Sequence, residues 1–574
     1  MRPRARGLLS LLLAAALLAG CAPAGPTENP STAPESSGAA VEFTGETAAP
    51  EEALKTEQAL TQIRALGESP EDNYRVWYEI FVYSFCDSNG DGIGDLKGVT
   101  SKLDYLRELG INGIWLMPIH PSASYHKYNV SDYRSIDPAY GTGEDFRELL
   151  EECGKRNIRV ILDLVVNHTG SDHAWFTAAC EYLRALGDAE PNAGDCPYVD
   201  YYNFSREFRT GYTQVSGTDW YYESQFSPDM PDLNLGSEAV RAEIRDIMAY
   251  WLGLGVSGFR VDAAKEFYSG QTDANIEVLS WLQQTVTELK EDAYLVAEVW
   301  DSFDQVTRYY ESCVTSIFNY PFGDSTGKII KVIRGAGNPA TVTSFATALE
   351  KADRAYLGAN PDYIDAPFLS NHDVGRIAGF CGGDPAKTKL AGAMNLLMSG
   401  SAFLYYGEEI GMTGSGNDPS KRAPMYWNTQ RDSGTTQPPP ECVLPESYPF
   451  GSLEEQRFDD DSIYNYYRQL IAIRQAIPAI SHGRVAAEAA LNTGCVSAFR
   501  KTWGGGKLHR AAEHLPRDVP GGSERLWGLD PCRDPLGGGK PRYPGGLDPG
   551  AAPLRRGGAA PRKELIPRLT VRAR

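Results

Sequence analysis

Residues 258–265 read Gly-Phe-Arg-Val-Asp-Ala-Ala-Lys, a run of strand length in which an arginine and an aspartate are set among apolar residues. Seven other strand-length runs lie between residues 76 and 406, with helical periodicity between them. They occupy residues 76–85, 113–119, 159–166, 294–299, 316–321, 366–369 and 402–406. Their apolarity is continuous rather than alternating, which indicates strands buried on both faces. The chain is therefore predicted to be an α/β protein with a closed (β/α)8 TIM barrel, and an open doubly wound sheet is the alternative.

One connecting helix is especially clear. Ser237 can cap its start, and Gly253 or Gly255 can end it. Its apolar stripe consists of Val240, Ile244, Ile247, Met248, Trp251 and Leu252. With this helix included, we expect the barrel to comprise residues 73–168 and 235–482.

Two segments do not fit a simple barrel. The interval of residues 169–234 is too long for one connection, and its many aromatic, Asp and Gly residues predict a small inserted domain after the third strand. Residues 494–500 resemble the first strand of a C-terminal β-domain, which we expect to start within residues 483–503. Residues 504–574 then hold 14 Gly, 10 Pro and 11 Arg with a net charge of +7, and no alternating strands are visible. This tail is predicted to be either disordered or the product of a frameshift near residues 503–507, which would truncate the β-domain.

The first residues have the pattern of an export signal. Three arginines precede an apolar run over residues 8–18, and Leu-Ala-Gly-Cys closes it at Cys21. The run is too short to span a bilayer as a mature helix. The closing tetrad resembles a bacterial lipobox, which predicts a signal peptide over residues 1–21 and a lipid on Cys21; an ordinary signal peptide with a chance cysteine is the alternative. Residues 22–72 are then a flexible linker, and the rest of the chain is expected on the extracellular face of a bacterial membrane.

Composition excludes some partners. The chain has 55 Lys and Arg against 75 Asp and Glu, a net charge of −20, and no basic patch with interleaved aromatics, so nucleic acid is not an expected partner. The ten cysteines show no spacing typical of zinc sites. Cys180 and Cys196 close a short loop and could form a disulfide in an oxidising compartment.

Polar residues follow four of the apolar runs directly. In this barrel class, chemistry is performed by residues at the carboxyl ends of strands. A charged group next to a buried strand needs a partner or a function, because an unpaired buried charge is costly. The four strand ends are Asn167-His168, Arg260-Val261-Asp262, Glu298 and Asn371-His372-Asp373. Four such ends in one barrel predict an active site.

Two of these carboxyl groups suit glycoside hydrolysis, which needs one nucleophilic or basic carboxylate and a second that gives and takes a proton. Arg260 lies two residues before Asp262 on the same strand, so both side chains point to the same side. Arg260 is therefore expected to hold Asp262 ionised. This favours Asp262 as the nucleophile and Glu298 as the acid/base.

The strand ends also carry a family resemblance. Residues 163–168 (DLVVNH), 258–265 (GFRVDAAK), 298–300 (EVW) and 368–373 (FLSNHD) resemble the four signature regions of the α-amylase family, glycoside hydrolase family 13, in the same order and spacing. The resemblance covers roughly residues 74–480. It implies a retaining double displacement in which Asp262 attacks the anomeric carbon, Glu298 protonates the leaving oxygen and later activates water, and Asp373 stabilises the transition state.

The resemblance also implies substrate contacts. His168 and His372 are expected to hydrogen-bond the sugar, and Arg260 to position the nucleophile. Residues 125–129 (YHKYN) match the family segment that supplies a stacking tyrosine, here Tyr128, and a further sugar contact, here His126. The sequence departs from the family at the residue between them, where lysine replaces the usual glycine.

Linkage preference depends on three features. Residues 230–234 (MPDLN) resemble a subgroup that lies between oligo-1,6-glucosidases and neopullulanases. Ala263 stands where oligo-1,6-glucosidases usually have valine, and Lys265 matches a lysine that contacts the aglycone side in α-amylases. Ala263 and Lys265 favour cleavage of α-1,4 bonds in starch or maltooligosaccharides. The alternative enzymes are an α-glucosidase, an oligo-1,6-glucosidase and a neopullulanase-like hydrolase or transglycosylase. The non-enzymatic alternative is a glycan-binding lipoprotein, which we would expect to lack one of the acids.

The loop after the first strand is rich in Gly and Asp. Its residues at positions one, three, five, seven and nine are Asp87, Asn89, Asp91, Ile93 and Asp95, which match a loop that wraps Ca²⁺ with four side chains and one carbonyl. Gly98 stands where an EF-hand has its closing Glu, and an acidic turn is the alternative. Related enzymes bind calcium at this loop, so the resemblance implies a structural Ca²⁺ as the cofactor.

Overall fold

The structure is a computed structural model that describes residues 55–67, 70–431, 434–504 and 570–572. The predicted signal peptide with Cys21, residues 22–54 and 68–69 of the predicted linker, and residues 505–569 and 573–574 of the predicted tail lie outside the described residues. The linker prediction is wrong for residues 55–64, which form the helix α1 (Lys55–Arg64) and contact α16 (Ile463–Ala476). Among the helices that the structure describes, none is long and apolar enough to cross a lipid bilayer.

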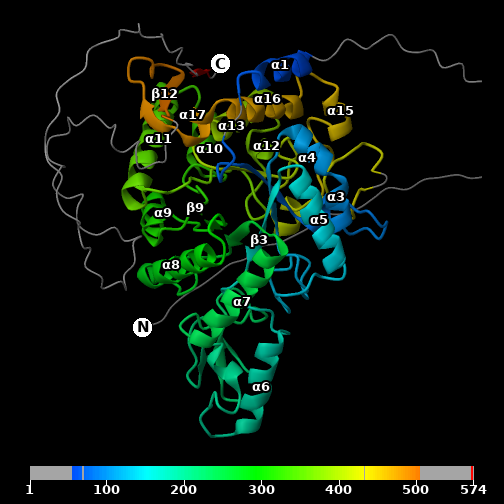
Figure 1. Ribbon diagram of the computed structural model, residues 1–574, viewed down its shortest axis with the longest axis vertical. Coiled ribbons are helices and arrows are strands. Elements are labelled where there is room, and N and C mark those ends of the chain that lie inside the picture. Colours follow the sequence, from blue (N-terminus) through cyan, green and yellow to red (C-terminus); the bar gives the residue numbers. More distant parts are fainter. Residues whose placement is uncertain (1–54, 68–69, 432–433, 505–569, 573–574) are drawn as a thin grey trace, which may run out of the picture. The chain divides into compact units, whose positions relative to one another are not determined.

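A parallel sheet forms the centre of the fold (Figure 1). Its strands are β1 (Val76–Ile80), β2 (Gly113–Leu116), β3 (Arg159–Leu164), β7 (Gly258–Val261), β8 (Tyr294–Ala297), β9 (Ser316–Ile317) and β10 (Ala402–Tyr405), in the order β10-β1-β2-β3-β7-β8-β9. Between β9 and β10, Phe318 forms a parallel bridge with Ala366, and the amide of Phe403 donates to the carbonyl of Pro367 at 2.8 Å. This segment closes the ring, so the predicted (β/α)8 barrel is confirmed.

Two strand predictions need correction. Residues 366–369 take the place of the seventh barrel strand, between β9 and β10, but contribute one bridge rather than a regular ladder. The run of residues 76–85 was predicted as one strand, but β1 ends at Ile80 and the short helix α2 (Val82–Phe85) follows. Both halves of that run are buried, and continuous apolarity alone does not distinguish a buried strand from a buried helical turn.

Large aromatic side chains fill part of the barrel interior. Trp77, Trp115, Tyr294 and Phe403 are all at most 2% exposed. The ring of Trp77 stacks on those of Tyr294 and Phe403, with centroids 5.1 and 5.9 Å apart. A Cβ on Gly113 would lie 2.4 Å from the Trp77 ring, so only glycine leaves room for that ring in β2.

Helices surround this sheet (Figure 1). They are α1 (Lys55–Arg64), α3 (Leu96–Ser101), α4 (Leu103–Leu109), α5 (Gly143–Lys155), α7 (Glu238–Leu254), α8 (Thr272–Leu289), α9 (Phe303–Tyr309), α10 (Lys328–Arg334), α11 (Pro339–Ala359), α12 (Ile377–Phe380), α13 (Pro385–Leu396), α14 (Asp418–Lys421), α15 (Leu453–Arg457), α16 (Ile463–Ala476) and α17 (Pro478–His482), with a 3-10 turn η2 (Tyr310–Ser312). The predicted helix α7 buries the apolar stripe expected for it. It runs through Gly253 and ends at Gly255, whose φ of 113° suits glycine. Ser237 stands at the N-cap position, but its side chain makes no capping hydrogen bond.

A small domain is inserted between β3 and α7, as predicted. It contains α6 (Ala174–Leu186), η1 (Pro197–Asp200) and an antiparallel sheet of β4 (Phe204–Ser205), β5 (Tyr212–Gln214) and β6 (Tyr221–Glu223). In Figure 1, α6 lies with this domain beyond α7. Its core includes the ring of Phe176, which packs against Tyr202 and Tyr222. Cys180 and Cys196 are both free thiols, so the disulfide considered for them does not form.

The segment after the barrel begins an antiparallel sheet. β11 (Arg484–Ala487) pairs with β12 (Val496–Thr502), which overlaps the strand predicted near residues 494–500. The backbone of β13 (Thr570–Arg572) pairs with the other edge of β12. α11 contacts both β11 and β12, so this small sheet packs against the barrel.

Candidate active site

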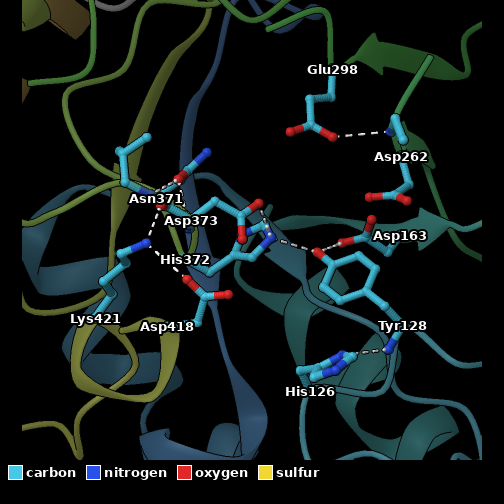
Figure 2. Close-up of polar contacts among 12 residues, drawn as sticks. His126, Tyr128, Asp163, Asp262, Glu298, Asn371, His372, Asp373, Asp418 and Lys421 are labelled. Atoms are coloured by element: carbon cyan, nitrogen blue, oxygen red, sulfur yellow. Dashed lines mark hydrogen bonds and ion pairs between the residues drawn. The ribbon is translucent and has the colours of Figure 1, made fainter. Parts of the chain in front are cut away.

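The predicted site residues meet at the carboxyl ends of the barrel strands (Figure 2). Arg260, on β7, is 1% exposed and lies between three carboxylates. Its Nη1 donates to Asp262 Oδ1 at 2.5 Å and also to Asp163, and its Nη2 donates to Glu298 Oε2 at 2.9 Å. The guanidinium of Arg260 therefore holds both predicted catalytic carboxylates in place by hydrogen bonds.

The environment of Asp262 differs in part from the expectation. The predicted contact with Arg260 is present and favours the ionised form. Burial acts more strongly in the opposite direction, with a further contribution from the nearby Glu298, and raises the pKa of Asp262 to about 7. Burial therefore opposes the ionised form of Asp262 that the sequence predicts from Arg260 alone.

Glu298 is oriented by the turn that follows β7. Its Oε2 accepts the backbone amide of Ala263 at 3.0 Å, and its Oε1 accepts the Tyr320 hydroxyl at 3.1 Å. Ala263 has a φ of 45°, a backbone conformation that is uncommon for a residue with a side chain. This left-handed turn directs the amide of Ala263 toward Glu298.

His372 and Asp373 form a second charged group on the opposite side of the site (Figure 2). His372 Nδ1 lies 2.6 Å from Glu79 Oε1, and its Nε2 lies 3.0 Å from Asp373 Oδ2 and 2.8 Å from the Tyr128 hydroxyl. The two carboxylates outweigh burial and raise the pKa of His372 to about 9. The imidazolium in turn, with Arg422, holds the pKa of Asp373 well below its usual range.

Three further residues around Asp373 were not predicted. Arg422 donates from Nη2 to Asp373 Oδ1 at 2.9 Å and from Nε to the His372 carbonyl at 3.1 Å. Lys421 Nζ donates to the Asp373 carbonyl at 2.6 Å and to Asp418 at 2.8 Å. These residues follow β10, in a segment without apolar periodicity. Glu79 was also missed, although an acid inside the apolar run of β1 was a usable signal.

His168 is available for a hydrogen bond. It is 2% exposed, and burial lowers its pKa to about 4, so the ring is neutral at pH 7. Its Nε2 has no hydrogen-bond partner in the described part of the chain. The ring of Phe226, from the inserted domain, lies over it with centroids 5.4 Å apart.

The segment with His126 and Tyr128 also reaches the site. The Tyr128 ring stacks on His372 at 5.4 Å, and His126 Nδ1 accepts the Tyr128 amide at 3.2 Å. Burial lowers the pKa of His126 to about 4, with a smaller contribution from Arg422. Between them, Lys127 keeps a φ of 69°, which explains why glycine is usual there, and its Nζ forms a buried ion pair with Asp137 at 2.5 Å.

Together these residues line a cleft of about 650 Å³. The cleft is lined by Asp262, Glu298, Asp373, His126, Tyr128 and His168, and by two aromatic rings, Phe226 and Trp300, that are 51% and 43% exposed. Lys265 is not part of the lining; its Nζ lies 3.6 Å from Asp301 and 3.8 Å from Glu266. The structure therefore brings the predicted site residues together with the exception of Lys265.

Residues 79–483 match the family model described as Alpha amylase, catalytic domain. The chain belongs to the α-amylase family of glycoside hydrolases. It is 38% identical over 434 residues to Alpha-amylase 3 of Dictyoglomus thermophilum, covering 74% of this chain and 82% of that protein. It is 28% identical to an oligo-1,6-glucosidase of Parageobacillus thermoglucosidasius, over 71% of this chain and 85% of the relative.

Solved structures agree with this family membership. The structure titled Eubacterium rectale Amy13B is 47% identical, with a TM-score of 0.75 over 79% of this chain and 88% of that chain. An α-amylase from H. orenii is 36% identical, with a TM-score of 0.63 over 75% and 88%. The protein is therefore an amylase-like glycoside hydrolase.

In the Gly- and Asp-rich loop after β1, the aspartate side chains accept hydrogen bonds from backbone amides of the same loop. Asp87 accepts the amides of Asn89, Gly90 and Gly92, at 3.0, 2.7 and 2.8 Å, and Asp91 accepts that of Ile93 at 2.8 Å. Within the described residues, no group of three or more His, Cys, Asp or Glu side chains is arranged to hold a metal ion. The available donors are nonetheless all oxygens, from three carboxylates, one amide and one carbonyl, a set that suits a hard cation.

Proposed function

We propose that this protein is a retaining hydrolase of α-1,4-glucosidic bonds in starch or maltooligosaccharides, with Asp262 as nucleophile, Glu298 as acid/base and Asp373 as transition-state stabiliser. The observation that carries the proposal is the single buried guanidinium of Arg260, which bonds both Asp262 and Glu298. It holds the two carboxyl groups side by side on one wall of the cleft, as a double displacement needs.

The proposed reaction proceeds in two steps. Asp262 attacks the anomeric carbon while the glycosidic bond breaks, and the proton of Glu298 passes to the leaving oxygen. Glu298 then removes a proton from water, the water oxygen bonds to the anomeric carbon, and the bond to Asp262 breaks. Asp373, kept ionised by His372 and Arg422, lies where it can stabilise the positive charge that develops on the sugar ring in both steps.

The lining residues suit a sugar. His168 presents a neutral ring with an unused Nε2, which can hydrogen-bond a hydroxyl. His126, Tyr128 and His372 lie along the same cleft or directly behind it, and we assign them to the bound glucosyl unit. The exposed rings of Phe226 and Trp300 offer apolar faces on which further sugars can stack.

Support for α-1,4 specificity comes from Ala263 and from the similarity to Alpha-amylase 3. The similarity to an oligo-1,6-glucosidase keeps α-1,6 cleavage and transglycosylation as the alternative. Maltoheptaose and isomaltotriose distinguish the two, because an α-1,4 enzyme releases shorter sugars from maltoheptaose alone. Mixed maltooligosaccharide products indicate internal cleavage, and glucose released singly indicates cleavage from one end.

The calcium site and the anchor belong to the same proposal. Asp87, Asn89, Asp91, Asp95 and the Ile93 carbonyl would hold a structural Ca²⁺, which supplies charge and rigidity to the loop after β1. Cys21 would carry the lipid that places the enzyme on the extracellular face of a bacterial membrane. Detergent partitioning of the wild type and of Cys21→Ser, each expressed with its signal, tests the anchor.

The functional test compares reducing-sugar release from starch by the wild type, Asp262→Asn and Glu298→Gln. We expect either substitution to reduce the rate by at least about 10³-fold. A control, Asp188→Asn in the inserted domain and outside the cleft lining, should keep the wild-type rate. Equal release by the wild type and both variants would favour a non-catalytic glycan-binding protein.

A further inference from the structure

A second hollow lies at the end of the barrel opposite the cleft. Its lining includes Arg75, which immediately precedes β1, and Asn112, which immediately precedes β2, so it lies at the amino ends of these parallel strands. Residues from α1, α4 and α16 complete its walls, and α16 contacts both α1 and α4. They lie near one another at the upper end of Figure 1. The hollow has a volume of about 450 Å³.

The lining of this hollow is basic, although the whole chain has a net charge of −20. We call it the arginine hollow after its five arginines, Arg64, Arg75, Arg107, Arg156 and Arg474. Two acids, Glu71 and Asp72, are also among the described residues that line it. Arg107 and Arg156 are paired with carboxylates outside this lining, because Arg107 lies 3.7 Å from Asp104, and Arg156 lies 3.0 Å from Asp104 and 2.6 Å from Glu152. Asp72 is already engaged, because His482 Nε2 lies 2.8 Å from its Oδ2 and the Tyr74 amide donates to its Oδ1 at 2.9 Å.

Arg75 offers a free guanidinium edge in this hollow. It is 2% exposed, and its Nη1 donates to the carbonyls of Asn112 and Asn157 at 2.9 and 3.3 Å. Its Nε and Nη2 find no hydrogen-bond acceptor among the described residues. The carboxylate of Glu71, which is 64% exposed, lies 3.7 Å from Nη2, beyond hydrogen-bond distance. Nε and Nη2 form the edge of a guanidinium that binds two oxygens of one anion.

Two buried arginines of the hollow, Arg75 and Arg474, have no carboxylate within hydrogen-bond distance among the described residues. Burial lowers the pKa of Arg75 to about 10, and repulsion from Arg159 adds to this effect. Burial also lowers the pKa of Arg474 to about 10, and its guanidinium donates to the backbone carbonyls of Leu396, Met398 and Gly400. Since an uncompensated buried charge is costly, an anion in the hollow would stabilise the fold.

We propose that the arginine hollow binds a phosphate group, with two of its oxygens on Nε and Nη2 of Arg75 and its remaining charge facing Arg64 and Arg107. A phosphate offsets the buried charge of Arg75, and it has enough oxygens for the Arg75 edge and for a second arginine. The phosphate can belong to a soluble phosphate ester or to the headgroup of an anionic phospholipid. Binding at this end of the barrel leaves the cleft free for glucan.

The test uses the full chain carrying Cys21→Ser, so that no lipid is attached. Thermal unfolding is followed with glycerol phosphate as the probe, against sodium chloride of equal ionic strength and with calcium held constant. We expect glycerol phosphate to raise the melting temperature of this protein above the chloride value. Arg75→Lys, which keeps the charge but loses the two-donor edge, should raise the concentration for half of the shift by about tenfold or more.

Two variants complete the design. Arg64→Ala removes a charge at the end of α1 and leaves the barrel strands unchanged. It therefore tests phosphate binding in the hollow even if Arg75→Lys fails to fold. Arg354→Ala, on α11 and 76% exposed, is the matched control and should respond as the parent does. The proposal is overturned if glycerol phosphate gives no shift beyond chloride, or if Arg64→Ala and Arg75→Lys both respond as Arg354→Ala does.

Vesicle flotation identifies the source of the phosphate once the shift is present. Binding to phosphatidylglycerol vesicles that is weakened by Arg64→Ala and is absent with phosphatidylcholine assigns the hollow to a lipid headgroup. A thermal shift with glycerol phosphate but no vesicle binding assigns it to a soluble phosphate ester.

Discussion

Glu79 Oε1 lies 2.6 Å from His372 Nδ1, on the side of the imidazole ring away from Asp373. Glu79 is 2% exposed and projects from β1, whereas His372 follows the segment that closes the barrel. The ring is therefore held between two carboxylates, which keep it protonated. Through this ring, Glu79, which does not line the cleft, positions Asp373, which does.

Glu79→Gln should shift the alkaline side of the activity profile. The pKa of His372 is raised from its ordinary value to about 9, so its stabilising contribution is complete below about pH 6.5 and is lost as the pH rises through 9. Removing the Glu79 charge lowers this pKa. We therefore expect kcat/KM of Glu79→Gln to fall at a lower pH than that of the wild type, while the exposed control Glu144→Gln keeps the wild-type profile. Superimposable profiles for all three proteins would contradict this role for Glu79.

At acidic pH, the dependence of kcat/KM on pH should reflect the ionisation of Asp262. Because attack needs the carboxylate and burial raises the pKa of Asp262 to about 7, kcat/KM should decline as the pH falls below about 7. This raised pKa also means that ionising Asp262 costs stability as the pH rises from about 4 through 7. The measurement is kcat/KM on maltoheptaose across that range. A plateau that extends unchanged to pH 5 would show that Asp262 remains ionised.

The substitution Lys127→Gly has two opposite effects on stability, one on the backbone strain at residue 127 and one on the ion pair with Asp137. Glycine relieves the left-handed backbone, which is worth about 1 kcal/mol, but it leaves the buried Asp137 without its partner, which costs about 3–5 kcal/mol. We expect a net loss in the free energy of unfolding, measured with urea. The double variant Lys127→Gly and Asp137→Asn should recover most of it. A single variant as stable as the wild type would mean that this buried pair contributes little.

Calcium removal tests the loop after β1. At a calcium concentration about 100 times the Kd, binding should stabilise the protein by about 2.7 kcal/mol, so EDTA should lower the melting temperature. Asp91→Asn keeps the oxygen that accepts the Ile93 amide but removes one charge, so it should weaken the calcium response. Asp246→Asn, on α7, is a control of the same charge change. If the melting temperature of the wild type changes neither with EDTA nor with calcium added afterwards, the protein does not bind a structural Ca²⁺.

Sequence reasoning found the residues whose signal is local. Arg260, Asp262 and Glu298 each follow or interrupt an apolar run, so their place at a strand end could be read directly. Glu79 was missed because its meaning depends on His372, 293 positions later in the chain. Arg422 was missed for a similar reason, since nothing in its neighbourhood indicates that it meets Asp373.

The errors about the fold have a related cause. Apolar runs mark burial, and burial does not specify the backbone, so residues 82–85 form a helix rather than part of β1, and residues 366–369 make one bridge rather than a strand. The pKa of Asp262 could not be predicted either. Its value is set by the balance between burial and the Arg260 charge, and only the three-dimensional structure gives the depth of burial.

The most direct test of the central claim is to trap the covalent intermediate on the nucleophile. A 5-fluoro-α-glucosyl fluoride is incubated with the wild type and with Asp262→Asn, and peptides are mapped by mass spectrometry. The account predicts a fluoroglucosyl adduct on the wild-type peptide that contains Asp262, and none on that peptide in the variant. An adduct on a different carboxylate, or first-formed products with the β configuration, would contradict it.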